Sequence, residues 1–149
     1  MSLHFSVARP VDGLQIQLRP EDLAEATVWC PGAPPEFSLA TCIAGAVAAT
    51  TVRSSGSIVA IYGYSLGDRT IHPWLMCSAP AVRHGKAILK LGRKLIRDLR
   101  REYPGRLIGN YVASGNTSAK RLLHSLGFRW VPSPGTGGFD FFFLPNPCV

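Results

Sequence analysis

The sequence lacks the closely spaced cysteine and histidine pairs that build metal sites. None of its four cysteines forms a C-x-x-C pair, and its four histidines are scattered: Cys30, Cys42, Cys77 and Cys148; His4, His72, His84 and His124. Structural zinc sites need thiolate and imidazole ligands at short spacings, so the sequence predicts no metal. We therefore expect free thiols, as in a protein of a reducing compartment.

Long hydrophobic runs are also missing. The longest, residues 39–52, is rich in Ala and Thr and falls short of the about 20 apolar residues that span a bilayer. The N-terminal stretch MSLHFSVARPVDG has neither the apolar segment nor the cleavage site of a secretory signal. The sequence accordingly predicts a soluble, cytoplasmic protein without a membrane partner.

Acidic residues are few: 9 Asp and Glu stand against 16 Lys and Arg, a net charge of +7. That excess favours a partner that carries phosphates or carboxylates, although a basic solvated surface produces the same balance. With 46% hydrophobic and 17% charged residues, the composition excludes a disordered chain. Its 149 residues predict a single domain, 1–149, that buries a core without disulfide or metal support.

Short apolar segments alternate with helical patterns along the chain. The clearest helix places Ile88, Leu91, Leu95 and Leu99 on one face and ends before Pro104. The same reasoning predicts strands at 14–18, 58–64, 71–77, 107–112, 128–131 and 139–144, and helices at 20–30, 37–52, 84–103 and 116–126. Hairpins mixed with strand–helix–strand passages are typical of α/β proteins with a mixed sheet and helices on both faces.

The passage from the predicted strand 71–77 into the long helix is a candidate anion site. A helix start offers unpaired backbone N–H groups and the positive end of a dipole, which together bind anions. Arg83 and Lys86 add charge there, and Gly85 lets a ligand approach the backbone. The segment fits a pyrophosphate cradle, or else a tight turn into a surface helix whose basic residues are solvated.

Basic residues continue along this helix. Only Asp98 and Glu102 oppose the bases of its polar face: Lys86, Lys90, Arg93, Lys94, Arg97, Arg100 and Arg101. Such a face can bind nucleic acid along its length, but no aromatic RNA-binding signature accompanies it. A solvated helix face is the default interpretation, and nucleic acid is not an expected partner.

The segment after the next predicted strand carries the most specific pattern. Asn116, Ala119, Leu122, Gly127 and Phe128 are spaced as in N-x-x-A-x-x-L-Y-x-x-x-G-F. This is a helix motif of the GNAT superfamily of acyl-CoA-dependent N-acyltransferases, which the chain resembles. L-R-P-E-D-L at 18–23 is similar to the family's first strand-to-helix passage, and P-x-x-R at 80–83 is similar to the entry into its pyrophosphate loop.

The resemblance implies a mainly antiparallel sheet of six to seven strands, and an N-acetyltransferase that uses acetyl-CoA to acylate an amine of unknown identity. It implies that strand 74–78 splays from 107–112, that pantetheine pairs with the free edge, and that a backbone N–H near Cys77 holds the thioester carbonyl. The cofactor-binding residues that it implies are Met76, Cys77, Ser78, Arg83, His84, Gly85, Lys86, Ala87, Ile88, Asn116, Ala119 and Leu123.

Two parts of the chain depart from the family pattern. Lys86 and Ile88 stand at the glycine positions of the pyrophosphate loop, where Gly85 and Ala87 could substitute one residue out of register. The helix tyrosine that often protonates the departing CoA thiolate is replaced by Leu123, which has no proton to donate.

Other side chains are therefore candidates for the chemistry. We predict Tyr111, on the strand beside the implied splay, as the proton donor, with His124 as the second candidate. A cleft-wall tyrosine and a solvated histidine are the structural alternatives. Cys77 could form an acyl-enzyme or simply pack within its strand. His72 and Glu36 could act as bases, although no spacing singles out either one.

A narrower resemblance indicates a different role. W-L-M-C-S at 74–78, N-Y-V at 110–112 and G-N-T-S at 115–118 are similar to the short GNAT-like proteins of short-tailed phages, one branch of which is an internal virion protein. It implies an alternative function, a catalytically silent GNAT-fold protein of phage assembly. Phage virion proteins or further copies of the chain would then be partners, in the host cytoplasm or the phage particle.

Overall fold

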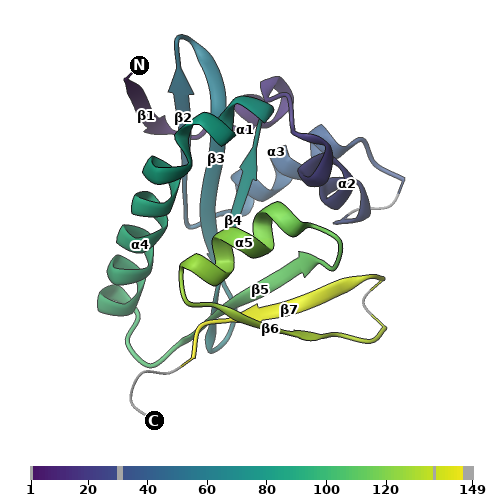
Figure 1. The fold of residues 1–149 in the computed structure, drawn as a ribbon, viewed down its shortest axis with the longest axis vertical. Coiled ribbons are helices and arrows are strands. Elements are labelled where there is room, and N and C mark those ends of the chain that lie inside the picture. The colour runs from purple at the N-terminus through teal and green to yellow at the C-terminus, as the bar shows by residue number, and fades with distance from the viewer. Residues whose placement is uncertain (1, 30–31, 136, 146–149) are drawn as a thin grey trace.

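Seven strands form one sheet in the computed structural model, which describes residues 2–29, 32–135 and 137–145. Their spatial order is β1-β2-β3-β4-β5-β7-β6 (Figure 1). The strands are β1 (Leu3–Val7), β2 (Ala48–Ser54), β3 (Ser57–Leu66), β4 (Thr70–Cys77), β5 (Leu107–Ala113), β6 (Arg129–Pro132) and β7 (Phe139–Phe143). Neighbouring strands are antiparallel except β4 and β5, which run parallel. The predicted mixed, mainly antiparallel sheet is confirmed.

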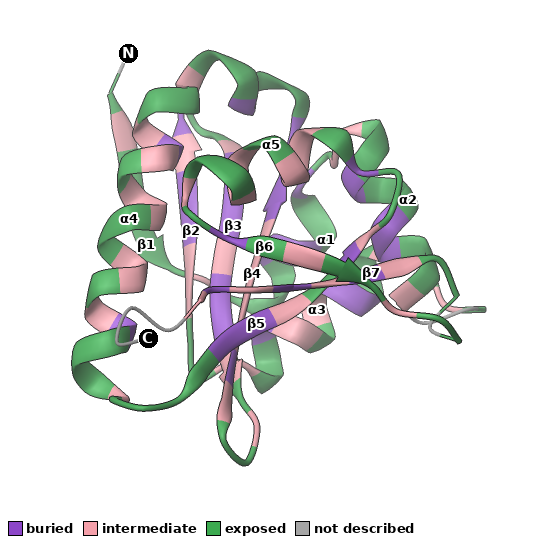
Figure 2. Ribbon diagram, turned by 60° about the horizontal axis from the view of Figure 1, so that its bottom comes forward, coloured by how far each residue is buried: buried purple, intermediate pink, exposed green. Residues whose placement is uncertain are grey.

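Helices cover both faces of this sheet, as predicted (Figure 1). α4 and α5 pack on one face, over a cluster that includes Ile71 and Leu99. α1 to α3 pack on the other, over a cluster that includes Leu39 and Ile61. Figure 2 shows buried residues concentrated on the central strands, while the helices expose their outer sides. The helices are α1 (Pro10–Gln15), α2 (Pro20–Trp29), α3 (Pro35–Gly45), the 3-10 helix η1 (Ala79–His84), α4 (Gly85–Glu102) and α5 (Thr117–Ser125).

The elements with the strongest patterns occur where they were predicted. α4 buries Ile88 and Leu99 at helical spacing, and α2 begins at Pro20. β3, β4 and β5 match the predicted strands to within a few residues. Gly127, which directly follows the predicted helix 116–126, adopts a φ of +92°, which glycine tolerates and other residues rarely adopt.

The predicted strand at 14–18 is wrong, because helix α1 extends to residue 15. Pro10 suits the first helical position, and the Asp12 carboxylate accepts the Arg9 N–H at 2.9 Å. Gly13 lets the helix lie against α3, since a Cβ there would sit 2.8 Å from the Ala40 nitrogen. Capping and packing thus override an alternating pattern. The first strand is β1, which the sequence analysis missed and which pairs with β2 at the sheet edge.

The predicted helix at 37–52 is correct only as far as Gly45, where α3 ends. The chain then enters β2, which pairs with β1 on one side and β3 on the other. Thr50, Thr51 and Val52 are β-branched and prefer a pleated strand, and Thr51 and Val52 are buried there. Two sheet partners therefore decide the conformation of a segment whose alanines favour helix.

Among the described residues, no helix is both long enough and apolar enough to cross a membrane. The same residues contain no group of three potential metal ligands. Cys42 and Cys77 are free thiols, whereas Cys30 and Cys148 lie outside the described ranges.

Candidate active site

β4 and β5 part soon after they meet. Their parallel pairing is confined to the first two residues of each strand. Beyond it, Asn110 Nδ2 donates to the Pro73 carbonyl at 3.1 Å and bridges the narrow end of the gap. The predicted splay of these two strands is therefore confirmed.

The backbone of Leu75 faces this gap. Ser78 N–H donates to the Val59 carbonyl of β3 at 2.9 Å, and successive N–H groups alternate in direction along a strand. The Leu75 N–H and C=O therefore point away from β3, and within the described ranges neither pairs with β5. An unpaired strand edge of this kind can pair with an extended ligand.

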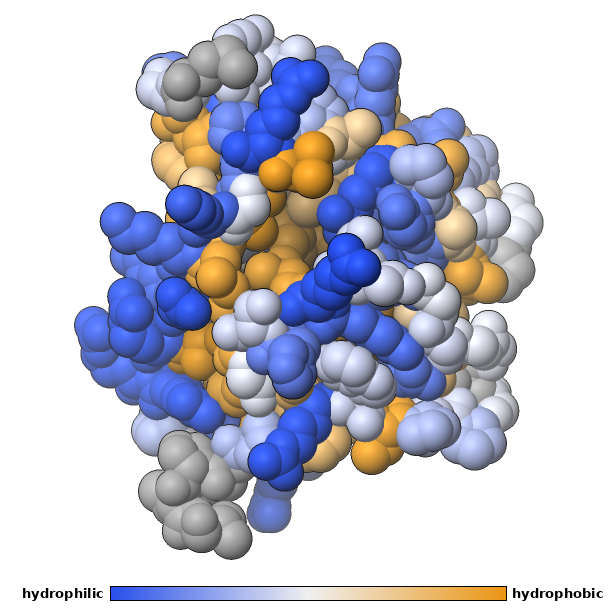
Figure 3. Space-filling model, viewed as in Figure 1, coloured by the Kyte–Doolittle hydropathy of each residue, from blue (hydrophilic) through white to orange (hydrophobic). Residues whose placement is uncertain are grey.

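An apolar cavity of about 110 Å³ lies beside the gap, between the sheet and helices α4 and α5. Leu75 of β4, Tyr62 of β3 and Leu123 of α5 line it. Gly92 brings the two helices close, because a Cβ on it would stand 2.9 Å from the Leu126 side chain. Figure 3 shows hydrophobic residues at the base of the recess between α4 and α5. This side of the gap suits an apolar, chain-like ligand.

A larger, open pocket of about 760 Å³ lies on the opposite face of the sheet, toward α2 and α3. Trp74 lines both this pocket and the apolar cavity, so the two hollows meet at β4. A donor held on one face can thus reach an acceptor held on the other. The residues that line this pocket include Trp29, His72, Trp74, Asn110, Tyr111 and Phe139.

Asp22, a buried carboxylate of α2, spans the wide end of the gap. It accepts the Cys77 N–H at 2.8 Å, the Arg19 Nε–H at 2.8 Å and the Asn116 amide at 3.1 Å. The sequence predicts that a backbone N–H near Cys77 donates to the thioester carbonyl. The Cys77 N–H itself cannot do so, because it already donates to Asp22. Within the described strands, the Leu75 N–H on this edge has no strand partner and can donate to a ligand.

Glu25, one helical turn beyond Asp22, holds the end of β5. Its Oε1 accepts the Ala113 N–H at 2.7 Å and the Asn116 amide at 3.4 Å. Burial raises the pKa of Glu25, an effect that these hydrogen bonds partly oppose and the nearby Asp22 charge reinforces. α2 thereby joins β4, β5 and the start of α5.

The raised pKa of Glu25 predicts a pH-dependent stability. Above 4.5, its ordinary pKa, the folded protein keeps a proton that the unfolded chain releases, so stability declines until the pH passes the raised value. Glu25→Gln should remove this part of the decline, measured as denaturant midpoints from acidic to neutral pH. Glu36→Gln, at an exposed site, is the control. Parallel pH profiles for Glu25→Gln and the parent would contradict the assignment.

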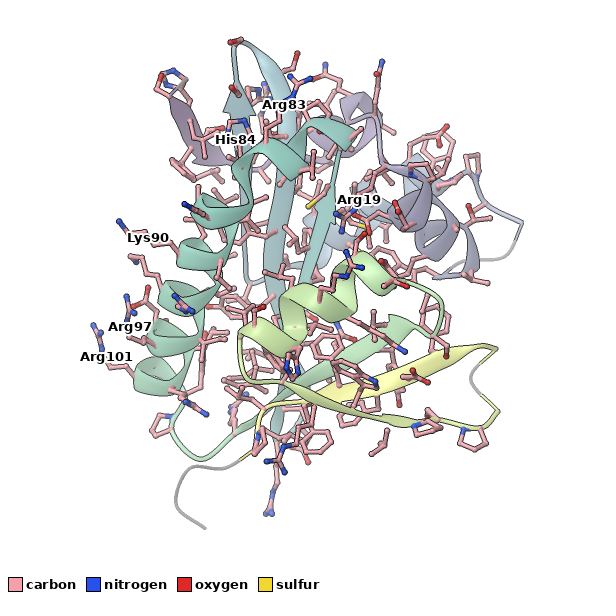
Figure 4. All side chains as sticks on the ribbon, viewed as in Figure 1. Arg19, Arg83, His84, Lys90, Arg97 and Arg101 are labelled. Carbon is pink, nitrogen blue, oxygen red and sulfur yellow. The ribbon has the colours of Figure 1, made fainter. Side chains whose placement is uncertain are left out.

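The candidate pyrophosphate cradle is exposed at the junction of η1 and α4. Arg83 and Lys86 are exposed, and Figure 4 shows Arg83 and His84 where the two helices join. His84 makes no side-chain cap, and the space around Gly85 is open. Two further residues predicted here turn inward: Ala87 is half-buried and Ile88 is buried in a core cluster.

The rest of the basic helix face points into solvent. Figure 4 shows Lys90, Arg97 and Arg101 directed away from the sheet. Lys94 pairs with Asp98 at 2.7 Å within the helix. Exposed pairs of this kind contribute little to stability, so the face remains a solvated surface with an excess of positive charge.

The side chains at the end of β4 are buried, so a ligand in the gap would meet their backbone. Met76 packs toward α3, and the Ser78 hydroxyl donates to the Val59 carbonyl at 3.1 Å. Burial raises the pKa of the Cys77 thiol to about 12. A thiol that stays protonated is a poor nucleophile, which favours packing over an acyl-enzyme role.

Helix α5 presents its predicted residues to different surroundings. Asn116 caps it, with Oδ1 accepting the Ala119 N–H at 3.1 Å. Leu123 lines the apolar cavity. His124 is exposed and is not among the described residues that line the cavity or the open pocket.

The remaining candidates also lie in distinct places. Tyr111 lines the open pocket and is 47% exposed. His72 lines the same pocket, but Nδ1 contacts the Gly109 carbonyl at 3.0 Å and Nε2 contacts the Thr70 hydroxyl at 2.9 Å. Both ring nitrogens are engaged, so His72 is poorly placed to act as a base. Glu36 is exposed in the first turn of α3.

Sequence reasoning missed several residues of this site. Asp22 entered the sequence analysis only as part of the L-R-P-E-D-L passage, and Glu25 was not considered. Their spacing of three places both on one helix face, a signal that was available. Tyr62, which lines the apolar cavity beside Leu123, lies in a strand whose alternation could have assigned it to that face.

No protein-family model matches the chain, and no curated protein matches it. Solved structures do. The PaiA N-acetyltransferase of Thermoplasma acidophilum, in complex with coenzyme A, is 11% identical with a TM-score of 0.66, over 98% of this chain and 100% of that one. A GCN5-related N-acetyltransferase from Kribbella flavida is 20% identical with a TM-score of 0.63, over 97% and 98%. YncA of Salmonella typhimurium, with its cofactor acetyl-CoA, is 18% identical with a TM-score of 0.54, over 95% and 91%. The chain therefore has the fold of the GNAT N-acetyltransferases.

Proposed function

We propose that the protein is an acetyl-CoA-dependent N-acyltransferase. The observation that carries this proposal is the gap between β4 and β5, with an unpaired Leu75 edge, an apolar cavity on one face and an open pocket on the other. Such a gap lets a thioester arm pair with β4 while an amine approaches from the opposite face. The CoA and acetyl-CoA complexes among the structures of the same fold support the choice of donor.

The residues around the gap fit the parts of this donor. The Leu75 N–H and C=O can pair with the amides of a pantetheine arm, whose methylene groups suit the apolar cavity. Arg83 and Lys86 are exposed and can form charge-assisted hydrogen bonds with the pyrophosphate, and Gly85 leaves the backbone accessible beside them. Leu123 adds apolar contact and no proton.

The transfer reaction requires an amine held against the thioester carbonyl and a hydrogen-bond donor directed at the carbonyl oxygen. When bound, acetyl-CoA supplies a thioester carbonyl that an amine can attack. The Leu75 N–H donates to that carbonyl oxygen and stabilises the negative charge that develops on it. The apolar cavity keeps water from the thioester. Tyr111, at the acceptor side of the gap, provides the proton for the leaving thiolate.

A second candidate is a catalytically silent GNAT-fold protein, including the phage assembly role implied by the sequence resemblance. The observation that favours it is the replacement of the family's helix tyrosine by Leu123, together with the engagement of the Cys77 N–H by Asp22. Such a protein would keep the fold and lose the transfer reaction.

The proposed function is tested by thermal unfolding with and without acetyl-CoA. A ligand at about 100 times its Kd stabilises a protein by about 2.7 kcal/mol, which gives a visible rise in Tm. Arg83→Ala should weaken acetyl-CoA binding at least about tenfold, since a charge-assisted hydrogen bond contributes about 1.5–3 kcal/mol. Arg97→Ala, on the solvent side of α4, is the control and should leave binding unchanged. No rise in Tm at millimolar CoA or acetyl-CoA would overturn the proposal.

A further inference from the structure

The open pocket on the α2 and α3 face has aromatic walls and no charged lining. Trp29, Trp74, Tyr111 and Phe139 come from four different elements and surround a volume of about 760 Å³. That volume lies within the range of about 300–1,000 Å³ that is typical of small-molecule sites. Among the described residues that line the pocket, none is Asp, Glu, Lys or Arg.

Neighbouring groups hold these rings in place. The Tyr111 ring meets the Phe141 ring edge to face, with centroids 5.4 Å apart, and Phe141 stacks on Phe143 at 6.1 Å. The Trp74 indole lies against the bare Gly63, where a Cβ would come within 2.9 Å of the ring. A preformed aromatic wall binds flat rings well because little side-chain entropy remains to be lost.

Two polar side chains of the pocket, Asn110 and His72, already have partners. Asn110 bonds the Pro73 carbonyl through Nδ2 and accepts the Tyr111 N–H at 2.8 Å through Oδ1. His72 uses both ring nitrogens within the sheet. Among the described residues that line the pocket there is therefore no carboxylate to hold an ammonium group and no unengaged imidazole to remove its proton.

We propose that the acceptor is an aromatic amine whose amino group is attached directly to the ring. The inference rests on the proposed function and names the substrate class of the same site. The nitrogen lone pair of such an amine is delocalised into the ring, so it is uncharged at neutral pH and needs no base before it attacks. Alkyl amines are protonated there and would have to lose a proton to a base before they could attack.

The step balances with groups already named. The amino nitrogen forms a bond to the acetyl carbon, and the carbon–sulfur bond breaks. The nitrogen gives up one proton to water, and the CoA sulfur takes one proton from Tyr111, which water then restores. The products are an N-aryl acetamide and free CoA, with no oxidant or reductant involved.

The experiment compares three acceptors: aniline, which is aromatic and neutral; benzylamine, which is aromatic and cationic; and cyclohexylamine, which is a cationic ring without π electrons. We expect kcat/KM for acetyl transfer to be at least about tenfold higher for aniline than for either of the others. Gly45→Leu should lower kcat/KM for aniline at least about tenfold. Gly45 lines the pocket with open space around it, so a leucine side chain there would occupy the space of the acceptor. Ala44 is an exposed neighbour that is not among the described residues lining the pocket, so Ala44→Leu should leave kcat/KM for aniline unchanged.

A binding measurement separates failure of this inference from failure of the proposed function. Trp130→Phe leaves Trp29 and Trp74 as the remaining indoles of the three in the chain, so fluorescence then reports on the pocket. Aniline should quench this fluorescence without CoA, and Gly45→Leu should abolish the quenching. Equal or faster acetyl transfer to benzylamine or cyclohexylamine would overturn the proposed substrate class and leave the proposed acyltransferase function intact. If no amine is acetylated, aniline quenching that is lost in Gly45→Leu supports the proposed substrate class. If aniline does not quench the fluorescence, the proposed substrate class is overturned.

Discussion

Asp22→Ala should lower the free energy of unfolding by about 3–5 kcal/mol, the usual cost of removing one partner of a buried ion pair. Asp22 is 1% exposed and accepts hydrogen bonds from Arg19, Cys77 and Asn116. Alanine would leave a half-buried guanidinium, a backbone N–H and an amide without their acceptor. Urea denaturation of the variant and the parent measures the difference.

The neighbouring acid provides the matched control. Glu21 lies in the same first turn of α2 but is exposed. Glu21→Ala should cost less than about 1 kcal/mol, because it loses only a favourable interaction with the helix dipole. Similar losses for the two variants would show that Asp22 acts through the dipole alone and that its buried contacts carry no net stability.

Tyr111→Phe should lower turnover about 100-fold or more once an acceptor is supplied, because general acid catalysis contributes about 100- to 10,000-fold. The change removes a hydroxyl and keeps the ring, so the edge-to-face contact with Phe141 survives. Acetyl-CoA affinity should hardly change. Steady-state rates and the thermal shift together distinguish lost chemistry from lost binding.

Tyr62→Phe is the matched comparison, since Tyr62 lines the apolar cavity on the other side of the sheet. We expect a small effect on turnover, because β4 separates Tyr62 from the gap. A large loss in Tyr62→Phe with none in Tyr111→Phe would move the proton donor to Tyr62. Leu123→Tyr, which restores the family pattern, should raise turnover in the parent.

The sequence predicted best where local patterns and tertiary packing agree. α4 carries a sustained apolar stripe, and α5 has both an Asn116 cap and a Gly127 stop, so neither depends on a distant partner. β2 depends on such partners, because its alanines favour helix and only pairing with β1 and β3 makes it a strand. The helical conformation of α1 likewise depends on its contact with α3.

The candidate site divides in the same way. Leu123 and Tyr111 could be selected because Leu123 occupies a position of the helix motif and Tyr111 lies on the strand beside the implied splay. The link from Asp22 to Cys77 joins residues 55 positions apart and has no local signature. The open pocket is still less accessible to sequence reasoning, since Trp29 and Phe139 meet only after the sheet has formed.

The short pairing of β4 and β5 has a consequence for the rigidity of the molecule. Strands β1 to β4 and strands β5 to β7 are joined by two residue pairs and by hydrogen bonds of the Asn110 and His72 side chains. The gap is therefore the most easily deformed part of the sheet, because side-chain contacts rather than a continuous set of backbone hydrogen bonds hold its two sides together. An extended donor paired with the Leu75 edge would stiffen this region, so the loaded protein should transmit force between its two halves better than the empty one.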